Sequence, residues 1–212
     1  MSAASGLTLL LPEERNPWIT STYGTGELIL NALNRGCRRF LIGIGGSATN
    51  DAGTGMLSAL GVKFFDHSGK VLKGCGGDLE QIAGMDVSAL VPEAQASEFI
   101  IACDVNTPFC GPEGAAYIFA PQKGATPPMV EALDRGMFSF AKVIADKFKI
   151  DIIPINGAGA AGGLGGAFKA FLNANLTNGI EMVLDAISFD SMIQDADLII
   201  TGEGRIDIQT TK

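Results

Sequence analysis

The sequence predicts an α/β fold in which helices flank a mixed or parallel sheet. Apolar segments typical of buried strands alternate with segments of helical periodicity along the 212 residues. A hydrophobic content of 47%, with only 18% charged residues, is enough for a substantial core. Many of the 28 glycines gather just after predicted strands, which is where open α/β sheets bind ligands.

The first part of the chain contains a predicted strand, turn and helix. Residues 22–36 carry an apolar stripe with helical spacing, with Thr25 as the candidate N-cap and Gly36 as the residue that closes the helix. Residues 39–44 predict a buried strand. After a glycine-rich turn, the apolar residues 53–60 predict a helix packed tightly on its neighbours.

The middle of the chain predicts a hairpin, a strand and a long helix. Residues 62–65 and 71–72 flank a turn with Ser-Gly chemistry, which is typical of a hairpin. Residues 98–103 predict a second buried strand. Residues 127–148 have helical periodicity and begin with prolines, which favour the first turn of a helix.

The last part of the chain predicts two more strands and one helix. Residues 150–155 predict a strand that leads into the glycine-rich residues 157–166, and residues 167–172 predict the helix that follows. Residues 195–201 predict a final strand. The sequence shows no linker and no internal repeat, and its length suits one large domain or two small ones.

The composition excludes several classes of protein. A formal net charge of −8, with no basic segment, argues against a nucleic-acid partner. No apolar run approaches the ~18 residues of a membrane span and the N-terminus has no charged leader, so a soluble protein without a membrane partner is expected. The four cysteines form no C-x-x-C pair, which indicates reduced thiols and a cytoplasmic location.

The most informative motif is GIGGSATND at residues 43–51. Its glycines expose backbone N–H groups, while Ser47, Thr49, Asn50 and Asp51 supply polar side chains directly afterwards. Such a turn can hold an oxyanion or a carboxylate. A tight turn in which Ser47 or Asn50 merely caps the next helix explains the same residues equally well.

The same turn also fits a dinucleotide site. GIGGSA at residues 43–48 matches the dinucleotide fingerprint, and Asp66 lies near the ~20-residue offset of a ribose-binding acid. GAGAAG at residues 157–162 matches the fingerprint too, without an acidic partner. A chain rich in glycine therefore produces this pattern easily, and neither match is specific.

A second glycine-rich turn and a lysine are candidates for phosphate contacts. Residues 157–166 are small enough to let phosphates reach the start of the next helix, through Gly157, Gly159 and Gly162. Close packing of that helix on the sheet is an equal alternative. Lys123 lies in a lysine-poor stretch and is a further candidate. No Walker A sequence occurs in the chain.

Two acidic clusters follow predicted strands. Asp104 and Asn106 come after the strand at 98–103, whereas Glu203, Arg205 and Asp207 follow the final strand. Carboxylates there can hold Mg²⁺ or accept a proton, and an arginine can clamp a carboxylate or a phosphate. Capped loops or surface ion pairs are the alternative explanation of each cluster.

Four motifs resemble the bacterial glycerate kinase family, in the same order and at similar spacing: GIGGSATNDAGTGM (43–56), ACDVNTPFCGPEGAAYIFAPQKGAT (102–126), GAGAAGGLGGAF (157–168) and ITGEGRID (200–207). The resemblance implies ATP-dependent phosphorylation of D-glycerate, with Mg²⁺ as cofactor and 2-phosphoglycerate as the expected product. Glycerate and ATP are the implied small-molecule partners, and a homo-oligomer is left open. A nucleotide- or dinucleotide-binding domain without kinase activity remains the alternative.

The resemblance also implies a two-domain fold with an inserted domain. Family members carry further residues before Ala3 and after Lys212, including P-D-S-F-K and D-G-G-E-G motifs that this chain lacks. Residues 1–212 are therefore expected to be the central or inserted portion, with flanking parts of a flavodoxin-like domain missing. Whether the chain turns over alone is left open.

The resemblance and the motifs together give a set of expected site residues. The attacking hydroxyl is expected to be activated by one of several acids, among which the base is not assigned. The expected catalytic residues are Asp51, Asp104, Glu203 and Asp207, with Asp104 and Asp207 as metal ligands; the substrate-binding residues are Gly45, Gly46, Ser47, Asn50 and Arg205; the nucleotide- or phosphate-binding residues are Lys123, Gly157, Gly159 and Gly162.

Overall fold

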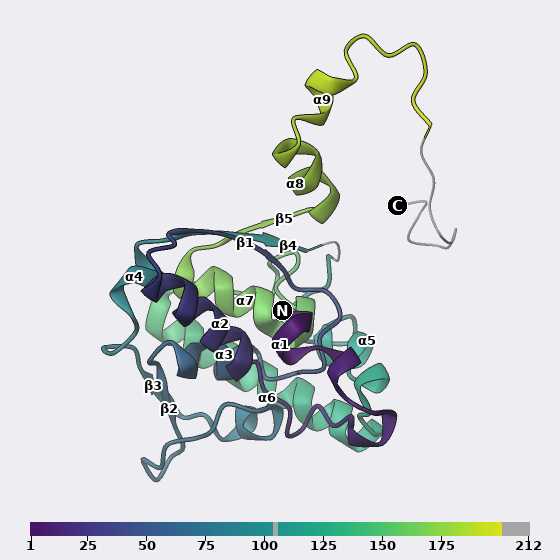
Figure 1. Cartoon of the computed structure of the whole chain (residues 1–212). Helices are drawn as coiled ribbons and strands as arrows, with labels where there is room; N and C mark the ends of the chain where they lie inside the picture. Colours follow the sequence, from purple (N-terminus) through teal and green to yellow (C-terminus); the bar gives the residue numbers. More distant parts are fainter. Residues whose placement is uncertain (104–105, 201–212) are drawn as a thin grey trace.

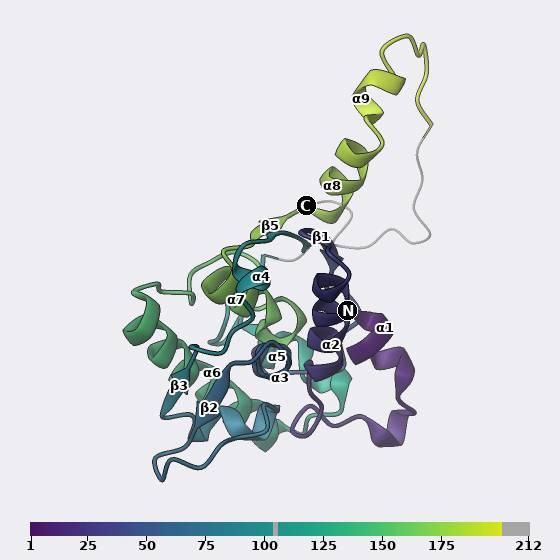
Figure 2. The same cartoon turned by 60° about the vertical axis from the view of Figure 1, so that its left-hand side comes forward.

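The computed structural model describes residues 1–103 and 106–200 (Figure 1). A sheet lies at one side of a helical body, and α8 (Gly179–Ala186) and α9 (Phe189–Met192) project away from that body (Figures 1 and 2). Within the described residues, no helix is long and apolar enough to cross a membrane. The prediction of an α/β fold with a parallel sheet and flanking helices is confirmed.

The other helices form the body on the side of the sheet opposite α8 and α9 (Figure 1). Short 3₁₀ segments connect several of them. In chain order these elements are α1 (Ser2–Ser5), η1 (Leu7–Leu9), η2 (Pro12–Glu14), α2 (Tyr23–Asn34), α3 (Thr54–Ala59), η3 (Gly76–Gln81), α4 (Pro92–Gln95), α5 (Ala115–Phe119), η4 (Pro121–Lys123), α6 (Pro127–Phe148) and α7 (Ala160–Leu172).

The main sheet has three parallel strands in the order β1 (Arg39–Gly43), β4 (Glu98–Ala102) and β5 (Asn175–Thr177). Phe40 pairs with Phe99 in the register of the first two strands, and their rings stack with centroids 4.7 Å apart. Because all three strands run the same way, the turns that follow them meet at one edge of the sheet. Ligand-binding residues are expected at that edge.

A second, antiparallel pair of strands lies away from this edge. It joins β2 (Lys63–Phe65) to β3 (Gly84–Asp86). The predicted hairpin is present only as a single bridge between Phe65 and Val71, so β3 is the main partner of β2. This partner was not predicted, because its three residues are too few to show a strand pattern.

The long helix α6 supplies much of the core. Leu133, Met137, Phe140 and Ile144 repeat at helical spacing and are all fully buried. The Phe140 ring packs edge-on against Phe64, with centroids 5.6 Å apart. Both ends of this helix agree with the prediction, because its apolar stripe is long and its start is marked by proline.

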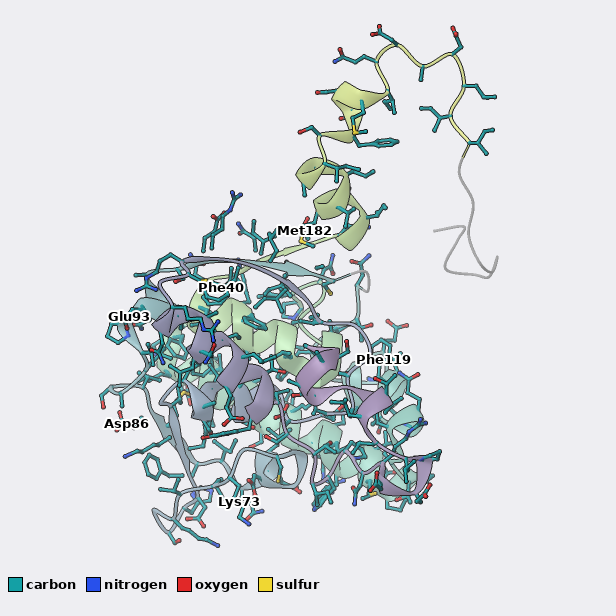
Figure 3. The ribbon with its side chains drawn as sticks, in the orientation of Figure 1. Phe40, Lys73, Asp86, Glu93, Phe119 and Met182 are labelled. Atoms are coloured by element: carbon teal, nitrogen blue, oxygen red, sulfur yellow. The ribbon has the colours of Figure 1, made fainter. Side chains whose placement is uncertain are left out.

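The outer face of the main sheet is only partly covered. A hollow of about 650 Å³ lies between this face and α8, and Leu41, Ile100 and Met182 are among the residues that line it. Leu41 remains 55% exposed. Figure 3 shows Phe40 on the side of the helical body and Met182 on α8, on the other side of the sheet. Helices therefore cover the sheet mainly from one side.

Three predictions about elements are wrong. Residues 150–155 contain no strand, and the third strand of the sheet is β5 instead. Residues 195–200 are not in a strand, while Thr201 lies outside the described residues. Thr25 lies inside α2 and does not cap it; the N-cap position is Thr22, whose side chain is engaged elsewhere.

Candidate functional site

A hollow of about 370 Å³ opens at the carboxyl ends of β1 and β4. We call it the anion hollow. Its walls come from the turn after β1, the end of β4, η4 and the first turn of α7. It is lined by Leu7, Ile44, Gly45, Gly46, Ser47, Ala102, Cys103, Phe119, Gln122, Lys123, Ala160 and Ala161.

The turn after β1 offers backbone donors to this hollow. Gly45, Gly46 and Ser47 line it, and no described residue accepts a hydrogen bond from their backbone N–H groups. Gly46 has a φ of +70°, a left-handed conformation that favours glycine. Its carbonyl accepts from the Leu7 N–H at 2.9 Å, which fixes the turn. Successive free N–H groups in such a turn form a concavity suited to an anion.

Lys123 brings a cationic group to the same hollow. The side chain is only 1% exposed, and its Nζ donates to the Thr49 carbonyl oxygen at 2.6 Å. Burial lowers the pKa of Lys123 to about 7, although the negative charge of Asp51 opposes this shift. An ammonium with one accepting carbonyl is incompletely paired, so an anion in the hollow would stabilise its charged form.

Asp51 lies behind the turn and not in the wall of the anion hollow. Its carboxylate accepts from Thr22 N at 2.7 Å, Thr22 Oγ1 at 2.8 Å, Gly53 N at 3.1 Å and Gly55 N at 3.3 Å. Burial raises the pKa of Asp51, and these hydrogen bonds lower it. The four bonds occupy the carboxylate, so the geometry favours a positioning role over the expected catalytic one.

Asn50 is also buried away from the anion hollow. Its Nδ2 donates to the Met137 sulfur at 3.2 Å, and its Oδ1 has no hydrogen-bond partner among the described residues. The side chain is 0% exposed. The geometry therefore ties Asn50 to the core and does not bring it to the substrate-binding position that was expected.

The second glycine-rich turn packs tightly against the first. A Cβ at Gly162 would clash with the Thr49 carbonyl, and the Gly162 carbonyl accepts from Ala52 N at 2.9 Å. A Cβ at Gly159 would meet the Pro108 carbonyl. Gly157, Gly159 and Gly162 do not line the anion hollow. Close packing thus explains Gly159 and Gly162. The neighbouring Ala160 and Ala161 line the anion hollow instead.

The predicted acid of a dinucleotide site has another function. Asp66 is partly exposed, and its Oδ1 accepts from Ser68 N, Ser68 Oγ and Lys70 N within its own turn. These bonds, led by that from the Ser68 hydroxyl, hold the pKa of Asp66 below its usual value. The carboxylate therefore stabilises the turn, which removes the residue that supported a ribose site.

Several expected residues cannot be placed in this site. Asp104, Glu203, Arg205 and Asp207 lie outside the described residues. In residues 1–103 and 106–200, no three His, Cys, Asp or Glu side chains are grouped to hold a metal ion.

Other lining residues were not predicted. Gln122 adjoins Lys123 in the sequence and could have been found with it. Leu7 and Phe119 form apolar parts of the wall and belong to no polar pattern that would have marked them.

A parallel α/β fold with free backbone donors and a buried lysine at its strand ends has the features of a domain suited to an anionic small molecule. Comparison with known proteins gives its family. The chain belongs to the glycerate kinase family, whose family model matches residues 1–212.

Individual relatives agree with this assignment. The chain is 50% identical to the glycerate kinase of Bacillus subtilis (strain 168), over 99% of the chain and 55% of that protein. It is 48% identical to the glycerate 2-kinase of Escherichia coli (strain K12), again over 99% of the chain and 55% of that protein. The chain thus spans about half the length of the curated relatives it matches.

A solved structure shows the same fold. The crystal structure of a protein assigned as glycerate kinase 2 from Salmonella typhimurium LT2 superposes with a TM-score of 0.92 at 48% identity. The match covers 100% of this chain and 56% of that one. The expected resemblance to glycerate kinases is therefore confirmed for the chain as a whole.

Proposed function

We propose that this chain carries part of the site for ATP-dependent phosphorylation of D-glycerate to 2-phosphoglycerate. The anion hollow supports the proposal best, because it combines the free N–H groups of Gly45, Gly46 and Ser47 with the ammonium of Lys123. The relatives of the chain that are named glycerate kinase support glycerate as the acceptor. Reduced thiols fit a reaction in the cytoplasm.

The reaction requires charge neutralisation more than covalent catalysis. A glycerate hydroxyl oxygen forms a bond to the γ-phosphorus of ATP, while the bond from this phosphorus to the bridging oxygen of ADP breaks. The hydroxyl proton leaves to a base, so the products are phosphoglycerate, ADP and a proton. Backbone donors and an ammonium stabilise the charge on the transferring phosphoryl group. The turn and Lys123 supply these groups from rigid elements.

The acids have separate proposed roles. Asp104 and Asp207 are the proposed ligands of Mg²⁺, Glu203 remains a candidate base and Arg205 a candidate clamp for the substrate. When bound, Mg²⁺ would neutralise charge on the phosphates. Asp51 is proposed to position the turn, since its carboxylate is already occupied.

The organisation of the whole protein is also a proposal. We infer that residues 1–212 correspond to the central or inserted part of the family fold. Two observations support this. The chain matches about half the length of its curated relatives, and the match to the solved structure covers the whole chain. The catalytic cleft would then be completed by parts of the family fold that this chain does not match.

Calorimetric titration with ATP–Mg²⁺, D-glycerate and NAD, each separately, tests the proposed function. ATP–Mg²⁺ and glycerate are expected to bind, whereas NAD is not. Lys123→Met should weaken ATP–Mg²⁺ binding by about tenfold, equivalent to ~1.4 kcal/mol, because it removes the cationic group and keeps the apolar stem. The matched control is Lys70→Met in an exposed turn, with affinity within about twofold of wild type. Binding of NAD alone would favour a dinucleotide site.

A further inference from the structure

We infer that glycerate lies in a second hollow, beside the anion hollow, where asparagine side chains bind its hydroxyl groups. This hollow, which we call the amide hollow, measures about 150 Å³ and lies at the carboxyl ends of β4 and β5. This placement rests on the proposed function, in which glycerate is the phosphoryl acceptor, and it locates glycerate in the amide hollow. The hollow is lined by Cys103, Asn106, Asn156, Gly157, Thr177 and Asn178, together with Leu176.

The chemistry of this lining suits a small hydroxylated molecule. It contains three carboxamides and one hydroxyl, and none of the described residues that line it is charged. A carboxamide both donates and accepts, as an alcohol does, so these groups can pair with hydroxyls in both directions. Phosphates would find no cation in the described wall. The anion hollow, with Lys123, differs in this respect.

The size of the amide hollow favours a molecule smaller than a nucleotide. Sites for drug-sized ligands measure ~300–1,000 Å³, and a water molecule occupies ~30 Å³ in the liquid. A hollow of about 150 Å³ therefore takes a molecule with a few heavy atoms, such as a three-carbon acid. The anion hollow is more than twice as large, at about 370 Å³, and has room for a phosphate group.

The two hollows are adjacent, as phosphoryl transfer requires. Cys103 lines both of them, and Gly157 of the amide hollow belongs to the same turn as Ala160 and Ala161 of the anion hollow. The Cys103 Sγ lies 3.8 Å from the Gly157 carbonyl oxygen, to which it donates. Donor phosphates in one hollow and an acceptor hydroxyl in the other would therefore meet across this shared wall.

The amide hollow is built on fixed elements. The Cys103 N–H donates to the Thr177 carbonyl at 2.8 Å, which joins the ends of β4 and β5. Asn178 caps α8, because its Oδ1 accepts from Ile180 N at 3.0 Å, and its Nδ2 group is then directed by that bond. The N-terminal end of a helix favours a negative charge, such as the carboxylate of glycerate.

Asn156→Asp in the whole chain tests the inference. The substitution keeps the shape of the exposed side chain, removes two donors and adds a negative charge that repels the glycerate carboxylate. By calorimetry, D-glycerate affinity is expected to fall at least tenfold, whereas ATP–Mg²⁺ affinity stays within about twofold. The matched control, Asn31→Asp on an exposed position of α2, should change neither affinity.

The outcomes separate this inference from the proposed function. If Asn156→Asp binds glycerate like wild type while Lys123→Met loses it, the acceptor lies in the anion hollow and the inference is overturned, but the proposed function stands. If the wild-type chain binds neither glycerate nor ATP–Mg²⁺, the proposed function fails and the inference fails with it. Asn106→Ala provides a second variant, with an expected selective loss of glycerate affinity because it removes a hydroxyl partner without adding charge.

Discussion

Lys123 and Asp51 hold the glycine-rich turn from the inside of the protein. Lys123 donates to the carbonyl of Thr49, and Asp51 accepts from the N–H groups of Gly53 and Gly55. The turn is therefore fixed just before and just after Asn50. A buried ammonium is costly, and a nearby carboxylate repays only part of that cost. The free-energy cost of burying the Lys123 ammonium is consistent with a bound anion as its missing partner.

The free energy of unfolding should rise with pH between pH 7 and 9 because of Lys123. Its pKa is about 7 in the folded protein against 10.5 for the ordinary side chain. The unfolded chain thus holds a proton that the folded chain has lost in this window, so stability increases with pH. The expected gain over the two pH units is about 2 kcal/mol, since one proton is worth ~1.4 kcal/mol per unit. Urea unfolding at several pH values measures it.

Lys123→Met is the control for this rise, because methionine does not titrate. The Met1 amino group, whose pKa burial lowers, and the Cys110 thiol, whose pKa burial raises to about 11, titrate in or near this window in both proteins. The difference between the two curves therefore isolates Lys123. Parallel curves would mean that Lys123 keeps its proton when buried, and would contradict the prediction.

At the level of elements, the left-handed start of α7 locks the two glycine-rich turns together. Ala161, Gly162 and Gly163 all have positive φ, so the regular helix begins only at Leu164. The Gly162 carbonyl accepts from Ala52 N, and its Cα faces the backbone of Thr49 without room for a Cβ. The shape of the anion hollow thus depends on contact between two backbones.

Gly162→Ala should lower the free energy of unfolding by about 3 kcal/mol, because it combines left-handed strain with a clash against fixed backbone. Gly36→Ala is a matched control: its φ is +89°, but a Cβ there meets nothing within 4 Å. The control should cost only the conformational strain, about 1 kcal/mol. Equal losses in urea unfolding would show that the contact with the first turn contributes nothing.

Elements with a long pattern could be predicted from the sequence, whereas short ones could not. The stripe of α6 extends over 22 residues and left no alternative. Residues 150–155 are as apolar as a strand, but only Ile152 is fully buried and the segment turns into α7. The third strand, β5, has three residues that are only partly buried or exposed, so its place is set by pairing with β4. Such pairing is not visible in local sequence.

The site was predictable where backbone or charge carries the signal. Gly45, Gly46, Ser47 and Lys123 were expected to contact ligand, and they line one hollow. Polar side chains were harder to interpret, because the sequence does not reveal which of them are buried. Asp51 follows the same turn, but its carboxylate faces the N-terminus of α2. The amide hollow draws its asparagines from three separated segments, so no single motif contains it.

Across the whole molecule, burial is concentrated in the helical body and is lacking in the projecting helices. α6 has seven buried residues, whereas α8 and α9 have none. Ile180, Val183 and Ile187 on or next to α8 are about half exposed, and Met192 is 70% exposed. The free energy that holds the fold together must therefore come mainly from the body, with little contribution from residues 179–192.

Hydrogen exchange should divide the molecule in the same way. Amides of α6 are expected to exchange only by global unfolding, whereas those of α8 should exchange at least ~100-fold faster, because local opening of an unburied helix costs little. Mass spectrometry of peptides from the two helices measures this difference. Equal protection of both would contradict the prediction and mean that the apolar side chains of α8 are covered in solution. A second copy of the chain is then the simplest partner for α8. Protection of α8 that falls on dilution would distinguish a dimer contact from a contact within one chain.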